Sequence, residues 1–76
     1  METGPENGIE SIYQRIGTRV RRRREDKGWT QEALAGKVAM SRSVIANLET
    51  GRCRLLLHDA IKLAQVLDIQ PTALLR

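Results

Sequence analysis

The chain has 76 residues, a net charge of +4, a single cysteine and only two aromatic residues. This length allows one domain, near the lower limit for a hydrophobic core that stands without disulfides or metals. The single cysteine excludes an intramolecular disulfide, and no Cys/His spacing resembles a zinc site, so we expect no metal and no cofactor. There is neither a signal-peptide pattern nor an apolar run long enough to span a membrane, so we expect a cytoplasmic protein.

The positive charge is concentrated in the middle of the chain. Residues 1–10 contain three acidic and no basic residues, residues 11–54 contain eleven basic and four acidic ones, and residues 55–76 contain two of each. A block with a charge of +7 favours a polyanionic partner. Because two aromatic residues are too few for a base-stacking platform, the composition favours duplex DNA over RNA or single strands.

The N-terminal third predicts a tail followed by a long helix. Residues 1–8 contain Gly, Pro, Asn and acidic residues without periodic apolar positions, which predicts a flexible tail. From Ile9 onward apolar residues recur at helical spacing, which predicts a helix that ends before Gly28. Its apolar face consists of Ile9, Ile12, Tyr13, Ile16 and Val20. We therefore expect the folded domain to span residues 9–76.

Two short helices come next, separated by a turn. Thr30 is a good N-cap for a helix over residues 31–38, and Ser41 is a good N-cap for one over residues 42–50, with Gly51 as its stop. Two helices joined by so short a turn form a helix-turn-helix, whose second helix enters the major groove of DNA. The outward face of that second helix is small and polar, with Val44 at its edge.

The C-terminal third predicts two more helices and no strand. Residues 56–67 form a broad apolar face, which predicts a helix deep in the core. That face consists of Leu57, Ala60, Ile61, Leu63, Ala64 and Leu67. A last short helix begins at Pro71 and carries Leu74 and Leu75.

Three segments resemble a known family when taken in order and with their spacing. They are TQEALA at 30–35, SRSVIANLETG at 41–51 and AIKLAQVL at 60–67. The combination resembles the phage-repressor (Cro, xenobiotic-response-element) helix-turn-helix proteins over residues 9–75. The resemblance implies an all-α, compact five-helix, lambda-repressor-like domain that binds double-stranded DNA, usually as a homodimer on an inverted repeat.

The resemblance also implies DNA contacts, position by position. Gln31 matches a glutamine that bonds a DNA phosphate. The family contacts bases from the start and outer face of the recognition helix, and the matching residues here are Ser41, Arg42, Ser43 and Asn47. The family contacts the DNA backbone from the loop that follows, and the matching residues here are Thr50, Arg52 and Arg54. The guanidinium of Arg42 suits guanine, and the amide of Asn47 suits adenine or a phosphate.

Two charges lie on the apolar stripes of their helices. Arg24 follows Val20 by four residues, and Glu49 follows Ile45 by four, so both side chains face the core. A partly buried charge needs a partner, and these two have opposite signs, as in the matching ion pair of the family. We predict a structural ion pair between them.

The pattern departs from the family at Leu55 and Leu56, which replace the usual proline and polar cap. The start of the fourth helix should therefore lack a side-chain cap. In the family the subunits usually meet through the end of the fourth helix and the fifth, so the resemblance implies a dimer contact through Ile69 and Leu75, with Leu74 folded inward. The alternative is that all three close the monomer core against Ile9, Ile12 and Tyr13.

Other residues have a plain interpretation beside a functional one. The run 21–24 is a phosphate-binding surface or a solvated helix face, and its members point in four directions. Trp29 belongs to the core. Cys53, which lies between two arginines, is either an unreactive thiol or a redox sensor. His58 has no nucleophile at a spacing that would form a catalytic group with it. Since no catalytic constellation occurs, we expect no enzyme.

These observations predict a sequence-specific transcriptional regulator, such as a small stand-alone repressor or a restriction-modification controller. The alternative, from another class, is an antitoxin or other protein-interaction module that binds DNA secondarily.

Overall fold

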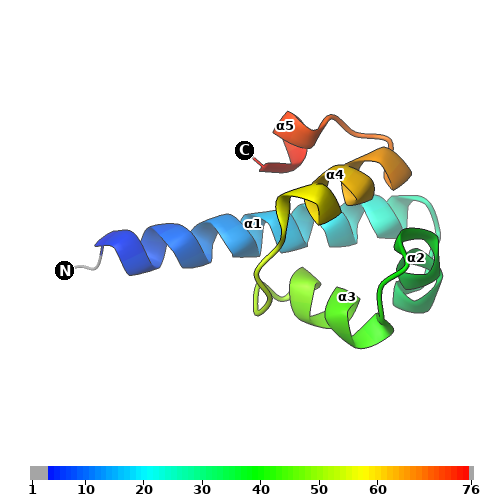
Figure 1. Cartoon of the computed structure of the whole chain (residues 1–76), viewed down its shortest axis with the longest axis horizontal. Helices are drawn as coiled ribbons and strands as arrows, with labels where there is room; N and C mark the ends of the chain where they lie inside the picture. The colour runs from blue at the N-terminus through cyan, green and yellow to red at the C-terminus, as the bar shows by residue number, and fades with distance from the viewer. Residues whose placement is uncertain (1–3, 76) are drawn as a thin grey trace.

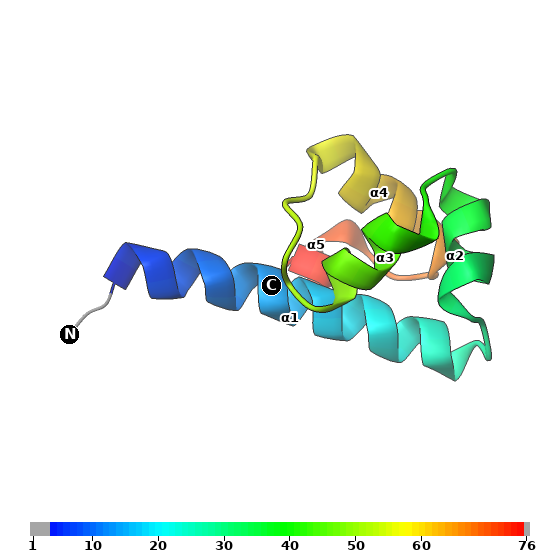
Figure 2. The same cartoon turned by 90° about the horizontal axis from the view of Figure 1, so that it is seen from below.

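The computed structural model describes the backbone of residues 4–75 and the side chains of residues 12–75. This part of the chain contains α1 (Gly4–Asp26), α2 (Gln31–Val38), α3 (Arg42–Glu49), α4 (Leu57–Val66) and α5 (Pro71–Leu75). Helix α1 is the long axis of the molecule, and the other helices gather around its C-terminal half, while its N-terminal half extends beyond them (Figure 1). In the view of Figure 1, α3 lies below α1 and α5 above it, whereas in the view of Figure 2 both helices lie on the same side of α1.

The start of α1 differs from the sequence prediction. The backbone is helical from Gly4, five residues before the predicted start near Ile9, so residues 4–8 of the predicted tail belong to the helix. Pro5 lies in the first turn, where its missing N–H has no intrahelical partner to lose. Residues 1–3 and the side chain of Ile9 lie outside the described part. The predicted end before Gly28 is confirmed.

The two short helices begin at the predicted caps. The hydroxyl of Thr30 accepts a hydrogen bond from the N–H of Ala33 at 3.0 Å, and that of Ser41 accepts one from Val44 at 3.1 Å. Between the helices, Ala39 adopts a left-handed conformation with φ of 57°. The chain thereby leaves α2 and enters α3 within three residues, Ala39, Met40 and Ser41, as a helix-turn-helix requires.

The core joins all five helices. Its buried apolar residues are Ile16, Val20, Leu34, Ala35, Val38, Ile45, Leu48, Ala60, Leu63, Ala64, Leu67 and Leu74. Trp29 is half-buried against this cluster, and Lys27 and Lys37 stand 5.3 and 4.6 Å from its ring centroid. Trp29 therefore packs against the core, as predicted, but it is not completely buried in it.

Three predicted core residues are exposed. Ile12, Leu57 and Ile61 are 42%, 69% and 40% accessible. The prediction was wrong for them because a helix buries only the part of its apolar face that a neighbour covers. The start of α4 lies at the edge of the bundle (Figure 1). Ile12 belongs to the N-terminal half of α1, which extends beyond the other helices. As predicted, Leu56 makes no side-chain cap to α4.

Helix α1 meets the end of α3 at a glycine that the sequence analysis did not single out. A β-carbon on Gly17 would approach the backbone oxygens of Leu48 and Glu49 at 2.3 and 2.8 Å. Only a residue without a side chain lets the two backbones come this close. Gly51, with φ of 78°, closes the end of α3 against Gln14 of α1 in the same way.

We predict opposite effects for two glycine-to-alanine substitutions in helices. Gly17→Ala should destabilise the fold by at least about 1–3 kcal/mol, because backbone atoms cannot move aside as a side chain does. Gly36→Ala, in the middle of α2 with no atom within 4 Å of an added β-carbon, should stabilise it by about 0.5–1 kcal/mol through helix propensity. Urea unfolding followed by circular dichroism measures both. A Gly17→Ala protein as stable as the unaltered chain would contradict the close contact.

Candidate nucleic-acid interface

A buried ion pair fixes α3 against α1. The Nε of Arg24 donates to Glu49 Oε2 at 2.7 Å, and its Nη2 donates to Oε1 at 3.0 Å. The two side chains are only 10% and 2% accessible. The hydrogen bond to Glu49 raises the pKa of Arg24 above its ordinary value, although burial acts in the opposite direction. The structure thus forms the ion pair that the sequence predicts.

The same carboxylate connects the ends of the helix-turn-helix. Gln31 is the first residue of α2, and Glu49 is the last residue of α3. The Nε2 of Gln31 donates a hydrogen bond to Glu49 Oε1 at 3.1 Å. The remaining nitrogen of Arg24, Nη1, donates to the carbonyl of Trp29 at 2.7 Å. Gln31, predicted to bind a phosphate, is therefore half-buried and partly engaged within the protein, and its amide nitrogen keeps a second hydrogen for an outside acceptor.

The outer face of α3 is open to solvent. Arg42, Ser43 and Asn47 are exposed, and Val44 is 37% accessible at its edge. Ser41 is exposed as well, but its oxygen is occupied as the N-cap, so what it offers a ligand is mainly its hydroxyl hydrogen. Figure 1 shows α3 on the outside of the bundle, with no other helix over this face.

The loop after α3 continues this surface. The hydroxyl of Thr50 donates to the carbonyl of Asn47 at 3.0 Å, and the backbone N–H of Arg52 donates to the same carbonyl at 2.9 Å. These bonds fold the loop back over the end of α3. Arg52 and Arg54 are exposed, and neither forms an ion pair with the side chains of residues 12–75. Thr50 and Arg52 thus lie beside Asn47 at the end of α3, whereas Arg54 lines an apolar groove with Ile12, Tyr13 and Leu55.

Other candidates do not join a reactive site. The Cys53 thiol is half-buried and donates to the carbonyl of Arg54 at 3.2 Å, while His58 Nε2 lies 3.3 Å from Asp59 Oδ1. Within the described residues, His, Cys, Asp and Glu form no group of three that could hold a metal ion. In the same part of the chain, no helix has both the length and the apolar character needed to cross a membrane.

The family described as "Helix-turn-helix domain" matches residues 15–76, most of the chain. The chain belongs to the helix-turn-helix family. The resemblance found in the sequence and the predicted five-helix fold are therefore confirmed. No protein of curated function matches the chain.

Solved structures of regulators match the whole fold. The restriction-modification controller protein C.AhdI from Aeromonas hydrophila is 36% identical, with 84% of this chain and 97% of that one covered and a TM-score of 0.79. The hypothetical transcription factor NHTF from Neisseria is 26% identical, with 90% and 78% covered and a TM-score of 0.82. SinR, the master regulator for biofilm formation, solved in complex with DNA, is 27% identical, with 80% and 98% covered and a TM-score of 0.74. None of the three is described as an enzyme.

We predict that Arg24 and Glu49 stabilise the fold only as a pair. Arg24→Met or Glu49→Leu should each cost about 3–5 kcal/mol, because each leaves a buried charge without its partner. The double variant should be more stable than either single variant, since it removes both charges together. A domain of this size has only about 4–11 kcal/mol of stability, so the single variants should be partly unfolded.

The exposed pair of Arg21 and Glu25, 3.1 Å apart on α1, is the matched control. Arg21→Met and Glu25→Leu should each change stability by less than about 1 kcal/mol. Urea unfolding of the two sets of variants measures the coupling in each pair. If the losses from Arg24→Met and Glu49→Leu simply added in the double variant, the two charges would not be coupled.

Proposed function

We propose that this chain is a sequence-specific transcriptional regulator that binds double-stranded DNA and reads the major groove with α3. The proposal rests on one observation above all: α3 presents an exposed, polar outer face while its inner face is buried and its last residue is held by Arg24. A recognition helix must be rigidly held on one side and free on the other. Its DNA target implies that the protein acts in the cytoplasm.

Side chains divide into two roles in this proposal. Arg42 and Asn47 read base edges, with the guanidinium of Arg42 suited to the two acceptors of guanine and the amide of Asn47 suited to adenine. Ser41 and Ser43 supply shorter contacts beside them. Gln31, Thr50, Arg52 and Arg54 bind phosphates on either side of the groove, which sets the position of α3 without reading sequence.

The similarity to C.AhdI and the match to SinR in complex with DNA support this function. A controller or repressor of this kind acts by occupying an operator. We therefore propose a controller or repressor role, in which the concentration of the regulator decides how much of the operator is occupied.

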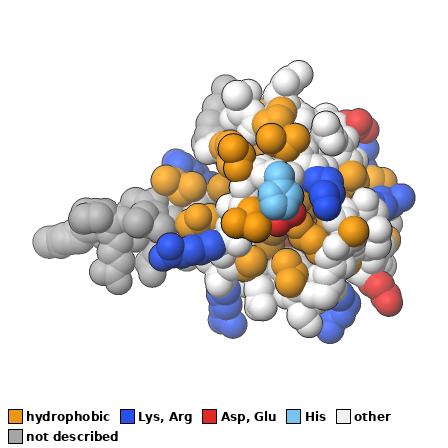
Figure 3. All heavy atoms as spheres, viewed as in Figure 1, with side chains coloured by type: hydrophobic (Ala, Val, Ile, Leu, Met, Phe, Trp, Pro, Cys, Tyr) orange, Lys and Arg blue, Asp and Glu red, His pale blue; other side chains and the backbone are white. Residues whose placement is uncertain are grey.

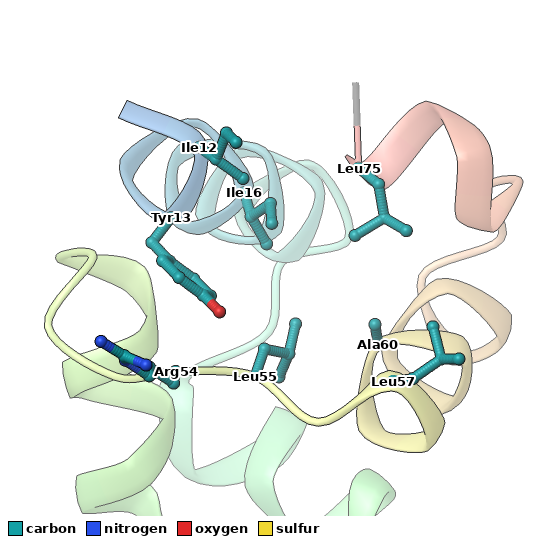
Figure 4. Close-up of a pocket in the computed structure, with 8 residues that line it drawn as sticks. All are labelled: Ile12, Tyr13, Ile16, Arg54, Leu55, Leu57, Ala60 and Leu75. Atoms are coloured by element: carbon teal, nitrogen blue, oxygen red, sulfur yellow. The ribbon is translucent and has the colours of Figure 1, made fainter. Parts of the chain in front are cut away.

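We also propose that the protein is a homodimer that binds an inverted repeat. An apolar groove of about 370 Å³ opens beside α5, and Leu75, Leu57 and Ile12 at its edges are exposed (Figure 4). Leu56 and Ile61 extend the exposed apolar surface along α4, and Figure 3 shows apolar side chains gathered around the single histidine there. An apolar surface of this kind marks an interaction site.

Leu75 rather than Ile69 is at the centre of the interface we propose. Leu74 is fully buried, so it belongs to the monomer core, whereas Leu75 is 40% accessible. Ile69 is half-buried and lines a different groove, beside arginines of α1. A second copy that covers the apolar groove would therefore contact Leu75 and Leu57 directly.

The test of DNA readout compares Arg42→Ala with Arg52→Ala on duplexes selected from a random pool. Arg42→Ala should weaken binding to the selected site by about 1–3 kcal/mol and relax preference at one base pair. Arg52→Ala should weaken all duplexes alike and lower the salt slope by about 1. Arg22→Ala, which removes the same charge from the side of α1 remote from α3, is the control. Selection of no consensus at low salt would overturn the proposed function.

The test of the dimer is Leu57→Lys combined with Leu75→Lys. Sedimentation equilibrium should find a folded monomer with unchanged helical circular dichroism, and cooperative binding to half-sites about one helical turn apart should be lost. Gln65→Lys combined with Gln70→Lys adds the same charge at exposed positions and should leave the dimer intact. An unaltered chain that is already monomeric would leave the apolar surface to another protein, which would favour the antitoxin class.

A further inference from the structure

A second basic surface lies on α1, away from α3. It is a groove of about 520 Å³ lined by Arg19, Arg22, Arg23, Asp26, Ile69 and Ala73. A smaller hollow of about 290 Å³ shares Arg19 and Arg22 and adds Arg15, so the two continue along α1. The DNA-reading residues line neither hollow.

This groove faces away from the surface proposed to bind DNA. Gly17 marks the side of α1 that touches α3. At about 100° per residue, Arg19 and Arg22 lie about 160° and 140° around the helix from Gly17. In the view of Figure 1, α5, which supplies Ala73, and α3 lie on opposite sides of α1. A duplex held by α3 would therefore leave the groove open.

The arginines of the groove differ from their neighbours in having no ion-pair partner among the side chains of residues 12–75. Arg21 pairs with Glu25 and Arg24 with Glu49, whereas no carboxylate of residues 12–75 pairs with Arg19, Arg22 or Arg23. One nitrogen of Arg19, Nη1, is also screened from solvent and has no hydrogen-bond acceptor in the part of the chain that the structure describes. A screened donor without an acceptor destabilises the protein, and an acceptor from a bound partner would remove that cost.

We propose that this groove binds an acidic segment of another protein while α3 is on DNA. Guanidinium groups form paired hydrogen bonds with carboxylates, so Arg19, Arg22 and Arg23 suit a run of acidic side chains. Ile69 and Ala73 give the same groove an apolar wall for a neighbouring aliphatic side chain. A phosphate backbone fits less well, because it has no aliphatic group to pack on the apolar wall of Ile69 and Ala73.

The experiment uses a blocked, fluorescently labelled peptide that alternates glutamate and leucine, with fluorescence anisotropy at near-physiological salt. The full chain should bind it, and Arg22→Glu should weaken binding about tenfold or more, because it removes a charge-assisted contact and adds a repulsion. Arg21→Glu makes the same charge change on the neighbouring residue, outside the groove, and should change binding by less than about twofold. A peptide with glutamine in place of glutamate should not bind.

A second measurement separates this site from the DNA surface. A mixed-sequence duplex should bind together with the peptide, and Arg22→Glu should leave its affinity within about twofold. Displacement of the peptide by duplex, equal losses in Arg21→Glu and Arg22→Glu, or no peptide binding would each overturn the proposal. So would a single-stranded oligonucleotide that binds in place of the peptide with the same dependence on Arg22. Failure of the duplex alone to bind would instead overturn the proposed function and leave the peptide result readable.

Discussion

The carboxylate of Glu49 is the point on which the arrangement of this domain depends. It accepts two hydrogen bonds from Arg24 of α1 and one from Gln31 of α2, and it is itself the last residue of α3. Arg24 in turn holds the carbonyl of Trp29, just before α2 begins. One buried anion thus joins three helices and the connection between two of them. Because a buried charge is costly unless all its partners are in position, the network tolerates only one placement of α3.

The backbone contact at Gly17 acts together with this network. The absence of a β-carbon lets α1 approach the end of α3, where Leu48 and Glu49 present their carbonyl oxygens. The ion pair joins the same two helices, with 2.7 Å between Arg24 Nε and Glu49 Oε2. With the end of α3 fixed in this way, the exposed residues Arg42, Ser43 and Asn47 on its outer face are free to contact a ligand.

The arginines of α1 have different partners on different sides of the helix. Arg24 faces inward and is structural, Arg21 is paired with Glu25, and Arg19 and Arg22 line a groove on the side remote from α3. A run of four arginines in the sequence is therefore not one basic surface. A helix turns each successive side chain by about 100°, which distributes neighbouring charges among different partners.

The sequence alone determined the elements that depend on local chemistry. Thr30 and Ser41 mark helix starts because their hydroxyls satisfy free amides, and the inward positions of Arg24 and Glu49 follow from helical periodicity. The family resemblance supplied the candidate DNA contacts, which remain a proposal. What only the tertiary structure decided is which apolar and charged faces find a neighbour. Leu57 and Ile61 belong to an apolar face yet stay exposed, Leu74 and Leu75 are adjacent yet separate into core and surface, and Gly17 is critical only because another helix arrives there. The pattern of a single helix specifies which face is apolar, but burial depends on the position of the other helices.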